Sequence, residues 1–520
     1  AGDTVGMFQV ESRAQIQMLR RVQPRTLPDL AIQVAIVRPG PIVGGAVNPY
    51  VRRRELLREN PDFQIPYEHP LMEEALGETL GVIIFQDQVL QVCQALAGFT
   101  DGQAEGLRRS MSRKRSREAM KSYWEAFREG AAKNGVDETT SQTVFQQVIA
   151  FSEFGFPKSH AAAFGLLAYQ SAWLCHYYPT EFYVGLFNNQ PMGFYSLDAL
   201  ARDARRHGLQ TLLPHINRSE VACTPEGDDL RVGLGFIRGW GSDIAEEVIE
   251  ERNRNGPFRS MPDFLRRTPA TLKRPAIENL IWVGGMDALG LSRRALLWQT
   301  GLWLGPESDE RRTVDRGNHE QIQMTLDGHF ANPSFDGLVE TDKMVAEYRM
   351  LRFSTEHHPL TLMKDYLPPG TITSDAFPRL ESGKIVRMAG LVTARQRPGT
   401  AKGFVFVLME DEYGPINVIV KPDLYEKERM IVRMEPFLWV KGRLQKDGLT
   451  SNVIAMEVRA LRANEPGGNS QTNGKKSIGR SALNPTLPPT LEYWAEPKER
   501  TPFRFLRALR QSPPGIKNFG

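Results

Sequence analysis

Cysteine is scarce in this sequence. Its 520 residues include three cysteines, Cys93, Cys175 and Cys223, with no Cys-x-x-Cys or Cys/His pair at metal-ligand spacing. This usage argues against a disulfide framework and against a zinc site, and it favours a reducing cytoplasm. Long apolar runs are also missing, because the best candidate, 161–175, is too short to span a bilayer and has a polar interruption at 169–171. We find no signal-peptide pattern, and we expect no membrane partner.

Charge and length narrow the class further. The net charge is only +4, but the pI is near 8.8 and the cations gather in local blocks. This balance is typical of a protein that binds nucleic acid rather than a membrane. A chain of this length is expected to hold about two to four domains. The first segment, 2–9, has no helix or strand pattern before it, so we expect further residues upstream.

Composition divides the chain into regions. Residues up to 225 show mainly helical periodicity, 226–300 place Gly-rich turns between short helices, and 301–345 have the mixed polar composition of a linker. Between 384 and 461, five short β-rich runs with Gly at the bends predict a small closed barrel of OB type. After residue 463 the sequence is rich in Gly, Asn, Ser and Pro, which predicts disorder.

The stretch 154–164 carries the most specific chemistry. Pro157 predicts a helix start, which places Lys158, Ser159 and His160 at or near the N-terminus of a helix. A cation, a hydroxyl and an imidazole beside free backbone N–H groups form an anion site, and phosphate is the anion we expect there. The alternative is a capped core helix whose polar residues are incidental.

A basic block follows Leu107. Its six cations are Arg108, Arg109, Arg113, Lys114, Arg115 and Arg117. No acid lies among them, and Arg108 and Arg109 follow an apolar residue, so we expect at least one of these two to face inward. A solvated helix face is the alternative, but the lack of interleaved acids favours a polyphosphate partner, either a nucleotide or a nucleic-acid backbone.

Two glycine turns are also candidates for backbone contacts. The turn Gly239-Trp240-Gly241, inside 233–245, resembles a helix-hairpin-helix turn that lets backbone N–H groups approach a phosphate, and 280–286 is its pseudo-partner. A plain helical hairpin is the alternative. The other turn, 38–41, presents Arg38 but is better explained as structural. The predicted fold is therefore multidomain, with a mainly α-helical region, a tandem helix-hairpin-helix module and a C-terminal OB-type β-barrel.

In this order, the motifs at 38–41, 107–109, 155–160 and 239–241, followed by an OB pattern, resemble the alpha subunit of bacterial DNA polymerase III, the C-family polymerases. The resemblance covers roughly 2–461 and is nearest to the error-prone paralogue used in translesion synthesis. That nearer likeness rests on three further stretches, 190–196, 203–208 and 395–398 leading into 410–414.

The resemblance implies a division of the chain. It would comprise the end of the palm (1–19), the fingers (20–225), the helix-hairpin-helix module (226–300), a linker and connecting region (301–383), the OB domain (384–461) and a disordered tail (462–520). The family's phosphoesterase-like domain and its palm aspartates, which hold two Mg²⁺ ions, would lie upstream of Ala1, so this chain alone would bind no metal and catalyse no transfer. Glu410-Asp411-Glu412 is a tight acidic triplet, but solubility at a barrel edge explains it.

The resemblance also assigns residues to ligands. The nucleotide-binding candidates are Arg108, Arg109, Lys158 and His160, with Ser159 and Arg38 as weaker ones. The DNA-binding candidates are Arg113, Lys114 and Arg115 in the basic block, Arg238, Gly239 and Gly241 in the hairpin, and Arg395, Arg397 and Lys402 in the barrel. Arginines would clamp phosphate oxygens, Lys158 would act as a point charge, and His160 would donate to the leaving pyrophosphate.

The implied function is nucleotidyl transfer from a deoxynucleoside triphosphate to a primer 3′ end by an error-prone DNA polymerase in DNA repair. Its partners would be primed or damaged DNA and nucleotides, with damage-response accessory proteins and a sliding clamp, bound through a degenerate peptide at 321–326, as further candidates. Two alternatives stay open. One is a non-catalytic DNA-binding protein built from fingers, hairpins and barrel, and the other is an RNA-binding module that uses the barrel.

Overall fold

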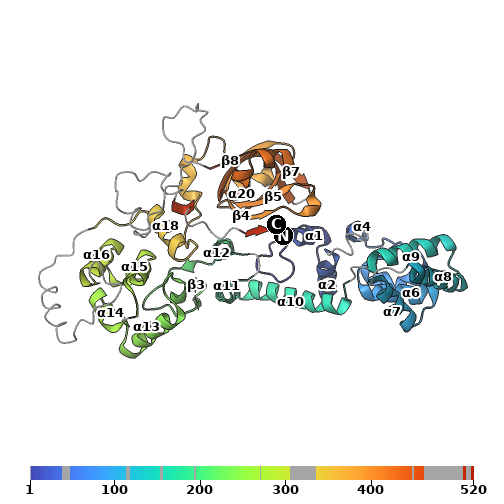
Figure 1. The fold of residues 1–520 in the computed structure, drawn as a ribbon, viewed down its shortest axis with the longest axis horizontal. Helices are drawn as coiled ribbons and strands as arrows, with labels where there is room; N and C mark the ends of the chain where they lie inside the picture. Colours follow the sequence, from blue (N-terminus) through green and yellow to red (C-terminus); the bar gives the residue numbers. More distant parts are fainter. Residues whose placement is uncertain are drawn as a thin grey trace. The chain divides into compact units, whose positions relative to one another are not determined.

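The computed structural model describes residues 2–37, 47–112, 117–152, 156–192, 195–269, 271–304, 335–447, 450–461, 508–510 and 517–519. The chain forms two compact units, Ala1–Tyr178 and Pro179–Gly520 (Figure 1). The side chains of each unit are therefore positioned by the helices and strands of that unit.

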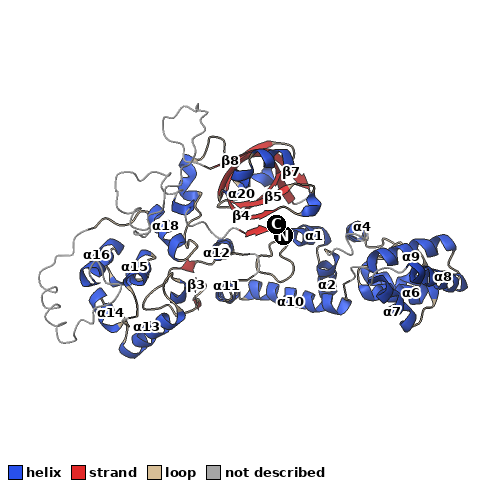
Figure 2. Cartoon of the chain, in the orientation of Figure 1, coloured by secondary structure: helices blue, strands red, loops and turns tan. Residues whose placement is uncertain are grey.

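The first unit is helical throughout its described part (Figure 2), as the periodicity predicts. Its longer helices are α1 (Arg13–Val22), α2 (Leu27–Ile36), α4 (Val47–Glu59), α6 (Gln86–Ala97), α7 (Asp101–Ser112), α8 (Arg117–Lys133), α9 (Glu138–Ser152) and α10 (Lys158–Tyr177). Between α4 and α6 lie a short helix, α5 (Glu73–Leu76), and two 3-10 turns, η1 (Pro70–Met72) and η2 (Gly77–Thr79). One core joins α6, α7, α8 and α9, and another joins α2 and α10.

One local feature lets α10 pack closely on α2, and another holds the start of α6. On α10, Gly165 lets α2 approach closely, since a Cβ there would lie 3.1 Å from the backbone nitrogen of Ala31. Before α6, the buried Gln88 accepts hydrogen bonds from the N–H groups of Ile84 and Phe85 and donates one to Thr79. These bonds hold the first turn of α6 in place, and they satisfy an amide that would otherwise be costly to bury.

The second unit begins with α11 (Pro179–Asn188) and α12 (Leu197–Arg206). A small sheet follows, with strands β1 (Thr211–Leu212), β2 (Thr224–Glu226) and β3 (Asp229–Arg231) in the order β1-β3-β2. These strands lie in and just after a region whose periodicity predicts mainly helix, and they are too short to show a two-residue alternation in the sequence.

Short helices and turns then follow, as the composition predicts for 226–300. They are η3 (Leu234–Phe236), α13 (Ser242–Asn255), α14 (Met261–Arg267), α15 (Arg274–Trp282), η4 (Asp287–Leu289) and α16 (Arg293–Leu304). The stretch predicted as a linker and connecting region, 301–383, also contains helical elements, which are α18 (Glu340–Met350), η5 (Thr361–Tyr366) and η6 (Ser374–Arg379).

The predicted OB-type barrel is confirmed. Its strands are β4 (Ile385–Gln396), β5 (Val405–Glu410), β6 (Pro415–Val420), β7 (Phe437–Asp447) and β8 (Thr450–Ala460), with helices α19 (Pro422–Lys427) and α20 (Arg429–Met434) between β6 and β7. The order is β5-β6-β8-β7-β4, and a further β5–β4 pairing closes the barrel. Among these five strands the pairings are antiparallel except that of β6 with β8. Alternating apolar residues of the five strands fill the interior.

The predicted disordered tail contains two described pieces. Ala508 and Leu509 are buried against the barrel side of α18, and the neighbouring Arg510 donates to the carbonyl oxygen of Leu461. Strand β9 (Lys517–Phe519) pairs in parallel with β4 at 394–396. Regular structure at these positions differs from the disorder that composition predicts there.

The acidic triplet at the end of β5 is structural, and the solubility interpretation is wrong for two of its members. Glu410 accepts a hydrogen bond from the buried Arg202 of α12 at 2.8 Å. Arg202 also pairs with Asp198, which accepts a hydrogen bond from Tyr348 of α18 at 3.0 Å. Asp411, also buried, accepts hydrogen bonds from both the backbone and the hydroxyl of Ser374. These carboxylates therefore tie α12 and the loops before β4 to the barrel.

Two of the sequence-based exclusions concern the fold. Among the described helices, none is long and apolar enough to cross a membrane. Cys93, Cys175 and Cys223 are all buried as free thiols, in agreement with the expectation of no disulfide framework.

Candidate phosphate site and nucleic-acid surfaces

The phosphate-site prediction places Lys158 at the start of a helix, and the structure confirms this start. Pro157 precedes α10 with extended backbone and offers no side-chain cap. Asp87, on the first turn of α6, takes that role, because its Oδ2 accepts the Lys158 backbone N–H at 2.7 Å. The backbone N–H of Gln86 donates to the carbonyl oxygen of Phe156 at 3.0 Å and fixes the two segments side by side.

The side chains at this helix start face solvent. The Lys158 ammonium lies 2.5 Å from Glu78 Oε2, and the two side chains are 52% and 38% exposed. His160 is exposed, and its ring lies against two aromatic rings, with centroids 5.1 Å from that of Phe156 and 4.1 Å from that of Phe164. Ring packing limits the directions in which the imidazole can point, while its edge stays accessible. Ser159 is exposed as well.

The basic block has an acidic partner that its sequence does not suggest. Glu105 lies one turn earlier on α7 and accepts two hydrogen bonds from Arg108, both of 2.6 Å, and one from Arg109 Nε at 2.8 Å. These bonds lower the pKa of Glu105 to about 2. The expectation of cations without an anionic partner is therefore wrong for this pair. The side chain of Arg108 is 27% exposed and that of Arg109 is 73% exposed, so one of the two is turned inward, as predicted.

Asp87 interacts with both predicted phosphate-binding motifs. Hydrogen bonds to Glu105, and more weakly the charge of Asp87, raise the pKa of Arg108. Because Asp87 also caps α10, the first turn of α10 and the end of α7 belong to one electrostatic neighbourhood. Sequence motifs alone do not reveal Asp87, Glu78 and Glu105, because each interacts with an element other than its own or lies one turn away from the cation block.

Several predicted site residues lie outside the described residues. They are Arg38, Arg113, Lys114 and Arg115, together with the clamp-peptide candidate at 321–326.

The hairpin turn of the second unit has two different glycines. Gly239 has φ of +87°, a left-handed value that favours glycine, and the adjacent Trp240 is buried with its Nε1–H donating to Ala276. Gly241 precedes α13 and provides no side-chain cap, and no described atom lies within 4 Å of a Cβ built on it. The first N–H groups of α13 are therefore presented at an open turn, whereas Gly239 serves the fold. The carbonyl of Arg238 is held by the Asn279 side chain at 2.7 Å.

The pseudo-partner turn is closed by its own side chains. A Cβ on Gly284, which has φ of +84°, would collide with the Arg293 guanidinium. That guanidinium is buried, and it binds the carboxylate of Asp287 and the carbonyl oxygen of Trp282. The turn at Gly284 is thus filled by the Arg293 guanidinium, whereas the turn at Gly241 has open space.

The three barrel cations differ in accessibility, and one assignment must be corrected. Arg395 is buried and donates to the carbonyl oxygens of Val432 at 2.7 Å and Glu435 at 2.5 Å, so it holds the end of α20 and does not reach DNA. Burial lowers the pKa of its guanidinium to about 10. The Arg397 side chain is 46% exposed and lies over the Tyr425 ring, with its guanidinium carbon Cζ 4.7 Å from the ring centroid. Lys402 is exposed in a loop between β4 and β5.

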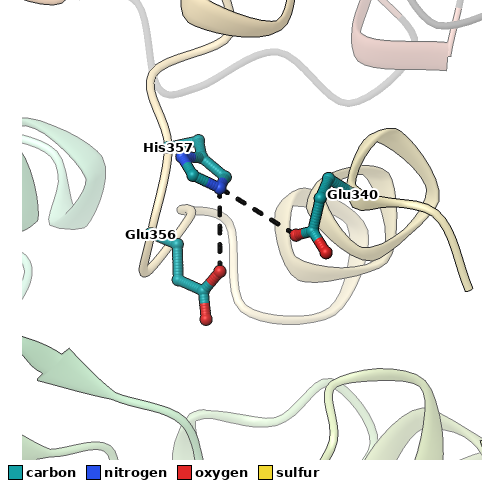
Figure 3. Close-up of side chains that lie close together, drawn as sticks. All are labelled: Glu340, Glu356 and His357. Carbon is teal, nitrogen blue, oxygen red and sulfur yellow. Dashed lines mark ion pairs between the residues drawn. The ribbon is translucent and has the colours of Figure 1, made fainter.

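Among the described residues, one group of histidine and carboxylate side chains has its ligand atoms close enough together to hold a metal ion. Three side chains of the second unit, Glu340, Glu356 and His357, place one ligand atom each within 4.8 Å of one another (Figure 3). His357 Nε2 lies 3.9 Å from Glu340 and 3.7 Å from Glu356, and Glu340 also pairs with Lys343 at 2.9 Å. The geometry is that of an exposed ion-pair cluster. It does not fit two Mg²⁺ ions, which require several bridging carboxylate oxygens.

Comparison with known proteins agrees with the sequence motifs. Residues 1–135 match the family model described as "Bacterial DNA polymerase III alpha subunit finger domain", and residues 208–296 match the model "Helix-hairpin-helix motif". Proteins named "Error-prone DNA polymerase" from Corynebacterium glutamicum and Burkholderia pseudomallei are each 38% identical, over 461 and 471 residues respectively. The protein of the same name from Mycobacterium bovis is 37% identical over 463 residues.

These alignments cover 88% of this chain in each case, but 41% to 42% of the relatives. The chain thus spans about two fifths of the length of the curated relatives that it matches. Among solved structures, the hypothetical protein ygiW from E. coli matches 18% of this chain with a TM-score of 0.15 and 18% identity, and it carries no argument about the fold.

Proposed function

We propose that this chain, which belongs to the bacterial DNA polymerase III alpha-subunit family, is the part of an error-prone DNA polymerase that binds the incoming deoxynucleoside triphosphate and primed DNA. The whole polymerase would transfer a nucleotidyl group to a primer 3′ end during repair or translesion synthesis. The buried free thiols support a reducing cytoplasm as its place of action.

One observation carries the proposal for the nucleotide. Asp87 links the two motifs, because it accepts the Lys158 backbone N–H at the start of α10 and its charge helps to raise the pKa of Arg108 on α7, far away in the sequence. Cations from two elements, beside an exposed imidazole, form a site for an extended polyanion rather than for one isolated charge. A triphosphate is such an anion.

Each side chain would have its own part in binding. The Arg109 fork would bind two phosphate oxygens at once, and Lys158 would add a point charge at the helix start. His160, oriented by two aromatic rings, would hold a proton near the leaving pyrophosphate. Ser159 would contribute a hydroxyl donor. These groups bind and orient the triphosphate, and they do not themselves form a bond to it.

Divalent metal use is general for such polymerases, and we propose Mg²⁺ for the whole enzyme. The described residues of this chain do not fit a two-ion site, because Glu340, Glu356 and His357 form an ion-pair cluster with a nitrogen ligand. No step is therefore assigned to a metal here. Magnesium bound by this chain alone would instead support a palm-like carboxylate set within its other residues.

DNA would contact the second unit. The open turn at Gly241 and the exposed Lys402 and Arg397 are the candidates for phosphate and single-strand contacts, with Gly239 and Arg238 shaping the turn. The boundaries 20–225, 226–300 and 384–461 remain our proposed division. Clamp and accessory-protein binding are further proposals for the whole polymerase.

The nucleotide site is tested with the 520-residue chain and a labelled deoxynucleoside triphosphate. We expect Arg109→Ala or Lys158→Ala to weaken binding by about 1.5–3 kcal/mol, or about ten- to a hundredfold, because a charge-assisted contact is lost. Arg128→Ala is the matched control, since Arg128 is an exposed, ion-paired cation elsewhere in the same unit. Equal affinity for all four proteins would remove these residues from the site.

A non-catalytic DNA-binding role is the second candidate, because the described residues contain no fitting two-metal site. Primer extension separates the two. If the longest natural protein that contains this chain binds primed DNA but never extends it, the polymerase proposal fails and the binding role stands.

A further inference from the structure

The cations of the proposed nucleotide site are not bare in the free protein. Glu105 receives hydrogen bonds from both Arg108 and Arg109, at 2.6–2.8 Å. Glu78, which belongs to η2, lies 2.5 Å from the Lys158 ammonium. The donor groups that would bind phosphate oxygens are therefore already bound to carboxylate oxygens, and a carboxylate, like a phosphate, can offer two acceptor oxygens to one guanidinium.

We propose that Glu105 and Glu78 are resident counter-ions that the triphosphate displaces, and that they hold its affinity below what the bare cations would give. The inference rests on the proposed function of this site and concerns its regulation. Two carboxylates would then help to set the affinity for the triphosphate, although the basic block itself contains no acid.

Ordinary helix spacing does not account for both pairs. Glu105 lies three and four residues before its arginines, a spacing at which ion pairs are common on helices. Glu78 and Lys158, by contrast, are 80 residues apart in the sequence and belong to different elements. Two different elements, α7 and η2, therefore each supply a carboxylate to a cation of the proposed site.

Displacement is feasible because these carboxylates are not sealed in the protein. The side chains of Glu105 and Glu78 are 32% and 38% exposed, so each can turn into water without leaving a buried charge behind. Exposed pairs of this kind change an equilibrium constant by only about one- to fivefold. The low pKa of Glu105, about 2, keeps it ionised at any pH at which a nucleotide is used. Asp87 differs, because it caps the backbone of α10 and must stay in place.

The arrangement has a use in a transfer reaction. Contacts that bind substrate and product polyphosphates equally tightly do not speed the chemical step, and they slow product release. A carboxylate that returns to its arginine or lysine as pyrophosphate leaves would favour that release. The balance involves only exchange of hydrogen-bond acceptors, and no covalent bond or proton transfer is needed.

The test uses tripolyphosphate and deoxyadenosine triphosphate as probes of the 520-residue chain, in calorimetric titrations at fixed ionic strength. We expect Glu105→Gln and Glu78→Gln each to tighten binding of both probes about two- to fivefold, and the double variant about tenfold. Glu138→Gln is the matched control, because Glu138 forms an exposed pair with Arg128 in the same unit, and it should change nothing. The gain should shrink as salt rises, since salt screens exposed pairs.

The outcomes separate this inference from the proposed function. If the two Gln variants bind no tighter, or more weakly, while Arg109→Ala and Lys158→Ala lose binding, the carboxylates are positioning residues and the counter-ion proposal fails. If the arginine and lysine variants also bind normally, the nucleotide site itself is wrong. Circular dichroism of every variant shows that it is folded before its affinity is compared.

Discussion

The same sequence spacing has opposite consequences in the two units. In the first, Glu105 and Arg109 are four residues apart on α7, and in the second, Asp198 and Arg202 are four residues apart on α12. The side chain of Arg109 is 73% exposed, whereas that of Arg202 is 6% exposed and lies between two carboxylates. Burial, and not the residue pattern, separates an arginine that can change partners from one that cannot.

The physical reason is desolvation. Burial alone would lower the pKa of Arg202, but the charges of Asp198 and Glu410 outweigh it and keep the pKa raised. Removing one member would leave the others charged and without water, which is far costlier than exposing a surface pair. A surface pair such as Glu105–Arg109 merely exchanges protein oxygens for water oxygens.

Methionine substitutions at the two arginines test this contrast most directly. Arg202→Met should lower the free energy of unfolding of the second unit by about 3–5 kcal/mol, because it strands two buried carboxylates. Arg109→Met should change the stability of the first unit by at most about 1 kcal/mol. Urea unfolding of the full chain, followed by a probe in each unit, measures both. Equal losses would mean that burial does not separate the two pairs.

The buried cluster around Arg202 also predicts a pH dependence. Burial, and then the charges of Arg202, Arg205 and Arg206, lower the pKa of His358 well below its usual value. Below about pH 6.5 the unfolded chain binds a proton at His358 that the folded chain does not bind. The free energy of unfolding should therefore decrease as the pH is lowered, by up to about 1.4 kcal/mol per pH unit. Above that pH His358 no longer makes stability depend on pH.

His358→Asn is the variant for this measurement, because Asn can still accept the Leu360 N–H that His358 Nδ1 accepts. Denaturation midpoints between pH 5 and pH 8 should lose part of their slope in the variant. An unchanged slope would place the titrating group elsewhere.

The hairpin turn offers an exposed backbone site that can be tested in the same way. Gly241→Val should weaken duplex binding about tenfold and equally for unrelated sequences, because the side chain would stand between the α13 N–H groups and a phosphate. Its backbone is extended and its surroundings are open, so the fold should persist. Gly239→Val is the contrasting variant, since its left-handed φ should lower stability first. Normal binding by folded Gly241→Val would leave the turn a purely structural one.

The smallest effect is expected in the barrel. Lys402→Ala should reduce the salt dependence of single-strand binding by about one counter-ion, with little change in stability. Arg395→Met should instead lower the stability and leave the salt dependence unchanged, because the buried Arg395 binds two carbonyl oxygens at the end of α20. Gel-shift titrations across salt concentrations, with melting curves, distinguish the two. A salt slope that falls for Arg395→Met instead would restore it as a DNA contact.

The sequence predicts the architecture better than the roles of individual cations. Alternating apolar runs specify the barrel, and Pro157 with the following apolar segment specifies the start of α10, because these signals are local. Arg395 and Lys402 could not be ranked from the sequence, since their difference is one of burial within a closed sheet. Glu78 could not be assigned to Lys158 at all, because only the fold brings residues 80 positions apart together.

The predictions for the short strands β1–β3 and for the acidic triplet are wrong for a related reason. A strand of two or three residues is too short to show a period, and it exists because a neighbouring segment supplies its hydrogen bonds. The sequence around Glu410 predicts a surface charge, because its partner, Arg202, lies more than two hundred residues earlier in the chain.

The pairing of strand β4 affects the order in which the sheet can form while the protein is being synthesised. Within three residues, 394–396, it pairs on one side with β5, which follows almost at once, and on the other with β9, more than a hundred residues later. During synthesis the hairpin of β4 and β5 can form early, whereas that second edge stays unpaired until residue 519 has left the ribosome. An unpaired strand edge is a place where another extended segment can add. In the interval between the synthesis of β4 and that of β9, this edge of a nascent copy can therefore pair with an extended segment of another copy, and a chaperone that covers it would prevent this.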